Sequence, residues 1–578
     1  MRRIIFALLL LLSCSGVVAK EVSPADALDV ARGVFGDLTR GAELSVAWDS
    51  RMFSATRGGF APTFYVVAPQ SGRGFVIVAG DDRVVPVLAY STRYEAPSYH
   101  LMPPNVEAWL RYVDGVVSYV RMHNLSQSEA VGELWSREFE HSDQTLLNTA
   151  RWSQNMPYNI YCPMDDDALS LTGCTQTAMA IIMYHHRWPL RAQGVSYAYT
   201  TDTKGIYVAD RDLNHSYDWD NMLDEYVEGE YNDEQAHAVA LLMADLGHSF
   251  RANYASEATS ALPDPSSLYY SYGYSPSCNF FMRDNYSYEG WNELMRSEIE
   301  AGRPIFYSGY TETFEGHAFV LDGFDDSDHF HVNWGWGGVS DGFFKLDGLL
   351  LDTYLFDTRQ WAFLGLHPVR DDEVDNWLYV ASPGISMPAT EFVPGLRFVI
   401  DAISVVNPSI LNFDGNIRVG VCDINGEFKS WASDAQSISL ENYYATSVLN
   451  VGVIINTEIE SGDRLSIYYR SKQGDEWHRM MPNGDAVRHE IVLKQPSIGE
   501  TTSLRFDKTS KMLTISHDVD VSASLLFLGS KVEEGVTKSS RSLKIDTRYL
   551  RRDDIYTIYL ERDGGVESKS YTFTLKNM

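Results

Sequence analysis

Cysteine is scarce in this chain, with five residues among 578: Cys14, Cys162, Cys174, Cys278 and Cys422. No two of them form a CxxC pair or another spacing typical of zinc ligands. The sequence therefore predicts neither a disulfide-rich scaffold nor a metal centre, and we expect no metal and no cofactor.

Basic charge and long apolar runs are also scarce. Lysine and arginine number 47 against 78 acidic residues, a net charge of −31. Phosphate-bearing partners need a basic surface, so this balance argues against nucleic acid and anionic membranes. The apolar run Ile4–Leu12 is too short to span a bilayer, and no later stretch resembles a transmembrane helix.

The first 19 residues have the pattern of a secretory signal peptide. Arg2 and Arg3 precede the apolar run Ile4–Leu12, and small residues ending at Ala19 form a cleavage site. An alternative is that Cys14 is a lipoprotein attachment site. The sequence thus predicts a secreted protein or, alternatively, an outer-surface lipoprotein.

The segment Leu171–Pro189 places Cys174 at the head of an apolar helix. Thr172 and Gly173 are typical of helix entry, and Pro189 cannot continue a helix. A thiol in the first turn faces unsatisfied N–H groups and the positive end of the helix dipole, which lower its pKa. We therefore treat Cys174 as a candidate nucleophile; the alternative is a small buried structural cysteine.

A predicted hairpin in the second half of this region carries the partner groups. Residues 317–324 and 329–334 alternate as strands around the acidic turn 325–328. Antiparallel pairing of the two ends would bring His317 near Asn333 and Trp334. A thiol, an imidazole and a group that orients the imidazole are what thiol-dependent acyl transfer requires. Four other histidines are alternative bases that we interpret as structural: His185, His186, His329 and His331.

An oxyanion-stabilising group is predicted upstream of the cysteine. Gln154 lies in the segment Trp152–Asn159, and its amide could donate together with the Cys174 N–H to a developing oxyanion. The alternative is an ordinary turn residue.

Composition and strand spacing divide the chain into five segments. Residues 125–150 are polar, and we interpret them as an exposed linker open to proteolysis. Helices followed by antiparallel strands predict an α+β domain in the middle, and short regular strands predict two β-sandwiches behind it. The expected boundaries are 1–19 for the signal peptide, 20–147 for an N-terminal α+β domain, 148–372 for the domain of Cys174 and His317, and 373–497 and 498–578 for the sandwiches.

Several segments resemble the streptopain family of bacterial secreted cysteine proteases, a branch of the papain-like fold. They are TGC followed by TAMAIIMYHH, WSQNMPYN, GHAFVLDG and HVNWGWGGVSDGFFKLD. The segment GFVIVAGDDRVVPVLAYS, residues 74–91, is similar to the family's inhibitory propeptide. The resemblance implies a papain-like catalytic domain, a self-inhibited zymogen, and protein and peptide substrates with a hydrophobic P2 residue.

The resemblance also implies roles for six residues: Cys174 as nucleophile, His317 as general base and acid, Gln154 in the oxyanion site, Asn333 and Trp334 in orienting and shielding the histidine, and Gly316 in the substrate cleft. Glu315 departs from the family, which has glycine beside the histidine. The family prototype lacks the two C-terminal domains, so their role is not implied.

Two other functions are compatible with the sequence. A Cys–His site can pass its acyl group to an amine rather than to water, which would make the protein an acyl transferase. Alternatively, the β-sandwiches bind host or matrix protein, and adhesion is a function of residues 373–578.

Overall fold

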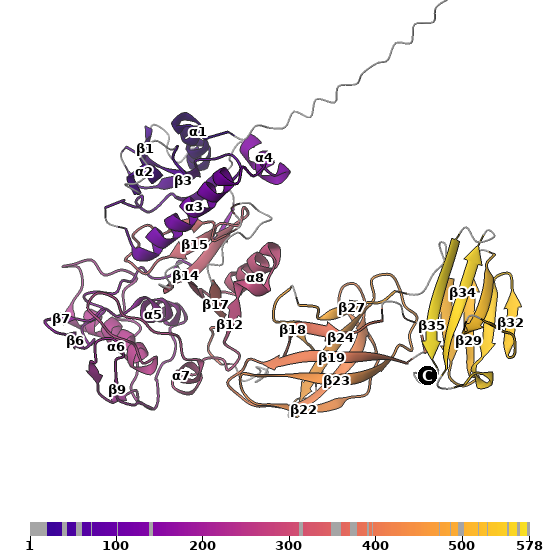
Figure 1. The fold of residues 1–578 in the computed structure, drawn as a ribbon. Coiled ribbons are helices and arrows are strands. Elements are labelled where there is room, and N and C mark those ends of the chain that lie inside the picture. Colours follow the sequence, from indigo (N-terminus) through magenta and orange to yellow (C-terminus); the bar gives the residue numbers. More distant parts are fainter. Residues whose placement is uncertain are drawn as a thin grey trace, which may run out of the picture. The chain divides into compact units, whose positions relative to one another are not determined.

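The computed structural model describes most of the chain in two compact units (Figure 1). It does not describe residues 1–19, 37–42, 54–60, 71, 101, 138–142, 311–315, 348, 350–359, 370–377, 390–391, 393, 396, 473, 475, 486, 495–501, 518–519, 529, 552–553, 563–566 and 575–578. The expected signal peptide, Cys14 and Glu315 lie outside the described residues. The first unit comprises residues 1–274, 280–284 and 288–368, and the second comprises residues 275–279, 285–287 and 369–578.

The N-terminal part of the first unit is an antiparallel meander with helices. Its elements are α1 (Pro24–Phe35), β1 (Leu44–Asp49), α2 (Ser50–Phe53), β2 (Phe64–Pro69), β3 (Phe75–Ala79), β4 (Val87–Ser91), α3 (Pro104–Met122) and α4 (Glu129–Ser136). The chain enters α1 through a capping box between Ser23 and Asp26. Helix α3 buries one apolar face, which includes Trp109 and Leu110.

The central part of the first unit contains the remaining helices and most of its large sheet. The helices are α5 (Cys174–His186), α6 (Asp233–Ser249), α7 (Pro265–Tyr270), η2 (Arg283–Asn285) and α8 (Tyr288–Glu300). The strands of the large sheet are β5 (Gln144–Leu146), β12 (Asn279–Met282), β13 (Ile305–Tyr310), β14 (Gly316–Asp325), β15 (Phe330–Asn333), β16 (Gly342–Phe344) and β17 (Trp361–Leu364). The helix predicted to begin at Cys174 is confirmed as α5.

Three two-stranded ribbons complete this part. They pair β6 (Met164–Asp165) with β7 (Ala168–Leu169), β8 (Val195–Ser196) with β11 (Arg211–Asp212), and β9 (Tyr199–Thr200) with β10 (Tyr207–Val208).

One sheet runs through both parts of the first unit. Its order is β1-β2-β3-β4-β16-β15-β14-β13-β17-β12, with β5 paired to β14. The parts join where β4 pairs antiparallel with β16, Tyr90 opposite Phe343 and Ala89 opposite Phe344. The N-terminal segment therefore continues the central sheet through main-chain hydrogen bonds. Helices α3, α5 and α8 all pack against β14 (Figure 1).

The predicted hairpin is present as β14 and β15, but its register differs from the expectation. Asn333 lies opposite Val320, and Leu321 lies opposite Val332. Strand β14 extends past the end of β15, and its first residues pair with β13, so His317 lies opposite Gly309. A β-bulge at Asp322 shifts the register, because the next pair joins Gly323 to His331.

Part of the expected exposed linker 125–150 is ordered against the sheet. Residues 144–146 form β5, and the main chain of Leu147 donates to the Asp322 carbonyl oxygen. The low apolar content of this segment suggested an unpaired loop, but main-chain pairing with β14 does not require apolar side chains.

The second unit consists of two pairs of packed sheets, as predicted. The first pair contains β18 (Tyr379–Ser386), β19 (Arg397–Asn407), β20 (Phe413–Cys422), β21 (Phe428–Trp431), β22 (Gln436–Leu440), β23 (Tyr444–Ile454), β24 (Arg464–Ser471), β25 (His478–Arg479), β26 (Met481–Pro482) and β27 (Glu490–Val492). The second contains β28 (Thr502–Asp507), β29 (Met512–His517), β30 (Ser522–Phe527), β31 (Ser530–Val532), β32 (Val536–Ser539), β33 (Ser542–Asp546), η3 (Thr547–Tyr549), β34 (Ile555–Arg562) and β35 (Glu567–Thr574). Each pair encloses its own apolar core.

Among the described residues, no helix has both the length and the apolar character needed to cross a membrane.

Candidate active site

Cys174 is the first residue of α5, as the sequence predicts. The residue before it, Gly173, has φ +95° and contacts a neighbouring segment closely. A Cβ atom at this position would lie 2.8 Å from the Thr259 carbonyl oxygen. Glycine is therefore required here both by the backbone conformation and by space.

The Cys174 thiol lies beside the start of β14. The main-chain N–H groups of Ala318 and Thr175 donate to the sulfur and favour the thiolate, but burial outweighs them and raises the pKa of the thiol. The sequence predicted a lowered pKa from the helix terminus. In the full-length chain the direction is reversed, because the cost of burying a charge exceeds the stabilisation by these N–H groups.

His317 and Gly316 lie at the first two positions of β14. His317 immediately precedes Ala318, whose N–H reaches the Cys174 sulfur. Gly316 is exposed, and the His317 side chain is partly exposed. Helix α5 and strand β14 thus bring the thiol and the imidazole-bearing residue, 143 positions apart in the sequence, to one place.

Gln154 lies next to the entry of α5. Its carbonyl oxygen accepts a hydrogen bond of 3.0 Å from the Thr172 N–H, and its side chain is buried. This bond fixes Gln154 to Thr172, which precedes Cys174 by two residues.

The side chain of Asn333 makes three hydrogen bonds to residues outside β14. Its amide nitrogen donates to the Thr149 hydroxyl at 3.0 Å and to the Ala150 carbonyl at 2.8 Å. Its amide oxygen accepts the Gly335 N–H at 3.1 Å. The side chain therefore holds the loop after β15 and the segment around Thr149.

Trp334 is buried and packs on the strand that carries His317. Its ring lies 4.8 Å from that of Phe319, two residues beyond His317 and on the same face of β14. Its indole N–H donates to the Ser340 carbonyl, and its main-chain N–H donates to Asp341 Oδ1 at 3.0 Å.

The N-terminal part of the chain contacts the segment that begins with Trp334. The buried Asn105 of α3 donates from its amide to the Trp334 carbonyl oxygen at 3.0 Å. One turn later, the Trp109 indole donates to the Lys345 carbonyl at 2.8 Å. Helix α3 thus binds one main-chain oxygen at the start of the loop that follows β15 and another directly after β16.

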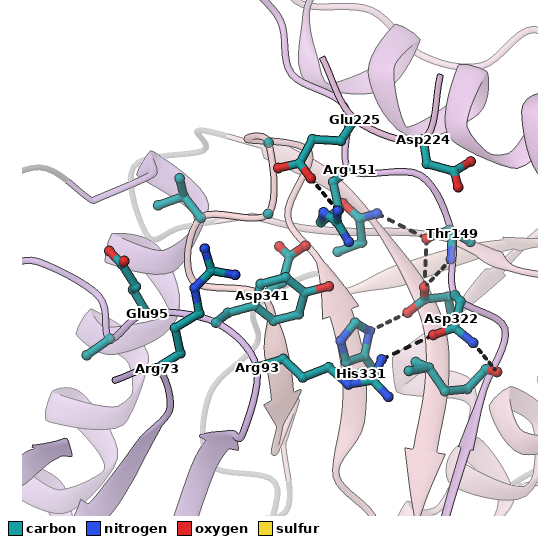
Figure 2. A pocket seen from close by; sticks show the side chains of 18 of the residues that line it. Arg73, Arg93, Glu95, Thr149, Arg151, Asp224, Glu225, Asp322, His331 and Asp341 are labelled. Carbon is teal, nitrogen blue, oxygen red and sulfur yellow. Dashed lines mark hydrogen bonds and ion pairs between the residues drawn. The ribbon is translucent and has the colours of Figure 1, made fainter. Parts of the chain in front are cut away.

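A cavity of about 750 Å³ lies between the N-terminal and central parts of the first unit (Figure 2). At its base, Asp322 accepts hydrogen bonds from the Thr149 N–H and hydroxyl and from His331 Nδ1. The ion pair lowers the pKa of Asp322 and raises that of His331, although burial opposes both shifts. Asp341 also lines this cavity.

The sequence pattern alone did not point to this acidic group. Asp322 entered the sequence prediction only as part of the strand 317–324, and in the structure a β-bulge at this position accompanies its bond to His331. A carboxylate within an otherwise apolar strand is the signal that would have pointed to it.

The alternative histidines have partners of their own. His329 lies between Asp325 and the Val87 carbonyl oxygen, and His185 contacts the Gly302 carbonyl oxygen. Burial lowers the pKa of His186 to about 4. Within the described part of the chain, no three His, Cys, Asp or Glu residues are grouped as metal ligands.

Models of two known protein families match this chain. A model of the peptidase C10 family matches residues 152–344, and a model of the Spi protease inhibitor matches residues 19–117. Streptopain of Streptococcus pyogenes is 30% identical over 299 residues, which cover 48% of this chain and 72% of streptopain. The chain belongs to the peptidase C10 family. The matched regions are a thiol-protease domain and, ahead of it, an inhibitor-like domain.

Another relative is similar over a larger share of the chain. The thiol protease/hemagglutinin PrtT of Porphyromonas gingivalis is 26% identical over 545 residues, or 86% of this chain. The chain spans 61% of the length of PrtT.

Two solved structures from Prevotella intermedia are also similar. A fragment of prointerpain A is 26% identical, with a TM-score of 0.43, 53% of this chain covered and 96% of the fragment covered. Active wild-type interpain A is 31% identical, with a TM-score of 0.35, 39% of this chain covered and 95% of that chain covered.

Proposed function

We propose that this C10 protein is a secreted cysteine endopeptidase made as an inactive precursor, with Cys174 as nucleophile and His317 as general base. The observation that carries the assignment is the position of the thiol, beside the Ala318 N–H and hence next to His317. Within the matched peptidase region, this is where a helix-borne thiol meets a strand-borne imidazole.

The proposed reaction is an acyl transfer in two steps. His317 accepts the thiol proton, the Cys174 sulfur attacks the peptide carbonyl carbon, and the amine leaves with a proton from the imidazolium. Water then attacks the thioester and releases the acid. The Cys174 N–H and the Gln154 amide would stabilise the oxyanion, a contribution of about 2.7–4 kcal/mol for one such donor.

The remaining predicted residues would act around this pair. Trp334 packs on Phe319 and would shield the imidazole, and the exposed Gly316 leaves space for substrate. The bonds of Asn333 support an indirect orienting role, through the loop that begins with Trp334.

The N-terminal domain, which we place at residues 20–147, would act as an intramolecular inhibitor. Three contacts support this role: β4 extends the catalytic sheet, Asn105 binds the Trp334 carbonyl, and Trp109 binds the Lys345 carbonyl. The raised pKa of the Cys174 thiol also suits a precursor that is not yet reactive. We place the catalytic domain at 148–372 and the two β-domains at 373–497 and 498–578.

Export is inferred from residues 1–19, whose basic head, apolar run and small-residue end are typical of a signal peptide. The mass of the exported protein distinguishes release into the medium from anchoring through a lipid on Cys14.

The proposal is tested by replacing the nucleophile in the full-length chain. We expect Cys174→Ala to remain unprocessed and to hydrolyse no casein, whereas Cys162→Ala, at a buried thiol outside the site, retains both activities. Processing and hydrolysis that persist in Cys174→Ala, in the absence of any other protease, would disprove the assignment.

A second function is favoured for the C-terminal domains. The similarity to PrtT, which is named as a hemagglutinin as well as a thiol protease, extends over 86% of this chain. We propose that residues 373–578 bind a host or matrix protein. Agglutination of erythrocytes by the full-length Cys174→Ala chain, and its loss when residues 373–578 are deleted, would support this role.

A further inference from the structure

The loop between β15 and β16, residues 334–341, has little intrinsic preference for its observed shape. Three of its residues are glycines with positive φ, namely Gly335 at +74°, Gly337 at +67° and Gly338 at +81°, and Ser340 has φ +64°. Glycine loses more conformational entropy on ordering than any other residue. The order of this loop therefore depends on bonds to its main chain.

Asp341 supplies such a bond at the base of the loop. Its Oδ1 accepts the main-chain N–H of Trp334 at 3.0 Å, and the Trp334 indole donates to the Ser340 carbonyl at 3.1 Å. Residues 340 and 341, at the end of the loop, thus fix Trp334 at its beginning. Trp334 in turn contacts Phe319 on the strand of His317.

The environment of Asp341 is unusual for a structural carboxylate. The residue is 1% exposed, and its Oδ2 has no hydrogen-bond partner among the described residues. Burial raises the pKa of the carboxyl to about 7, and the Trp334 N–H opposes this shift. The charged or titratable groups around it are His331 on β15, Asp322 on β14, Arg151, and Tyr94 of the N-terminal domain.

We propose that Asp341 is a positioning residue of this protease, which holds Trp334 against the strand of His317 and holds it more tightly when ionised. The proposal rests on the proposed function of Cys174 and His317. A carboxylate accepts an N–H more strongly than a neutral carboxyl group does. Activity that depends on Trp334 therefore increases as Asp341 loses its proton.

Removal of the N-terminal domain would change where this ionisation occurs. Tyr94, Arg93 and Arg73 line the cavity from that domain, so their departure rehydrates the Asp341 carboxyl. Because burial is what raises the pKa of Asp341 in the full-length chain, rehydration lowers this pKa in the matured enzyme.

The test compares Asp341→Asn, Asp341→Ala and the control Val339→Ala, a change at a 51% exposed side chain of the same loop. Each full-length chain is allowed to mature, and kcat and KM for a peptide substrate are measured from pH 4 to 9. Rates are divided by the amount of Cys174 that an irreversible thiol reagent labels. This normalisation separates the two possible failures. If Cys174 is not the nucleophile, it stays unlabelled and hydrolysis does not depend on it, whereas a failure of the Asp341 proposal leaves Cys174 labelled.

We expect Asp341→Ala to lose roughly 10- to 100-fold in kcat, which converts to about 1.4–2.7 kcal/mol, because the variant removes a hydrogen bond to a charged group. KM should change little. Asp341→Asn retains an acceptor but cannot ionise, so it should retain more activity than Asp341→Ala and lose one ionisation from the rising limb of the profile. Val339→Ala should match the wild type.

A wild-type pH profile and kcat in Asp341→Asn would overturn the proposal, whatever Asp341→Ala does. If Asp341→Ala fails to fold, the near-isosteric Asn variant decides alone. An equal loss in both variants with the rising limb unchanged would also overturn it, since that result indicates a purely structural role.

Discussion

Replacing Tyr90 by phenylalanine tests whether the N-terminal domain is held as a part of the catalytic sheet. The Tyr90 hydroxyl donates to Asp325 Oδ2 at 2.8 Å, and its ring stacks on Phe343 at 5.2 Å. Asp325 is 1% exposed, and its interactions with His329 hold the pKa of the carboxyl well below its usual range. The substitution retains the stacked ring and removes one donor from a buried carboxylate.

The size of the effect follows from the bonds that remain. Asp325 Oδ1 still accepts the main-chain N–H groups of Ser327 and His329, and Oδ2 still pairs with the His329 ring. A hydrogen bond to a charged group contributes about 1.5–3 kcal/mol, and the remaining bonds favour the lower part of this range. Separation of β4 from β16 should therefore become easier by about 1.5–2 kcal/mol, or roughly 10- to 30-fold.

Hydrogen exchange measures this separation directly. In a full-length Cys174→Ala background, which we expect to prevent self-processing, peptides covering β4 and β16 should exchange roughly 10- to 30-fold faster in Tyr90→Phe. Tyr197→Phe is the matched control, because the same hydroxyl is removed from a side chain that is 76% exposed. Exchange of β4 within twofold of the parent chain would refute the reasoning.

Two further predictions concern the site and its surroundings. Gly173→Ala should reduce kcat/KM at least 10-fold. The backbone at this position has φ +95°, and an added Cβ would lie 2.8 Å from the Thr259 carbonyl oxygen, so the side chain costs about 1–3 kcal/mol. Peptide hydrolysis measures the loss of kcat/KM, and wild-type kinetics would contradict the prediction. The His331–Asp322 pair should stabilise the precursor most between about pH 4 and 6.5. The pKa of His331 is raised in the folded chain, so the stability from the pair is lost as pH rises through the pKa of His331. The pKa of Asp322 is lowered, so the same stability is lost as pH falls through the pKa of Asp322. Thermal unfolding of the Cys174→Ala chain from pH 5 to 9 should show this decline, and His331→Gln should flatten it; an unchanged slope in His331→Gln would exclude the pair as the cause.

Local sequence determined most of the elements that carry the site. Helix α5 follows from the glycine at its entry and the apolar spacing after Cys174, and the strands of the hairpin follow from alternation around an acidic turn. These patterns depend on neighbours within a few residues, which is why they can be read without a structure. The motifs around Cys174 and His317 also sufficed to indicate the family.

Register and long-range pairing were decided only by the tertiary structure. The bulge at Asp322 and the overhang of β14 place Asn333 opposite Val320 rather than beside His317. The pairing of β4 with β16 joins residues about 250 positions apart through main-chain groups that every residue possesses, so the sequence pattern carries no signal for it.

The ionisation of the site was likewise decided by the fold. Helix position alone predicts a lowered pKa for the Cys174 thiol, yet burial raises it, and burial turns Asp341 into a carboxyl group that titrates near neutrality. Burial depends on which distant segments cover a group. The sequence by itself therefore determined which chemical groups this protein has and on which elements they lie, whereas tertiary packing decided their partners and their charge, because desolvation and pairing arise only when the chain is folded.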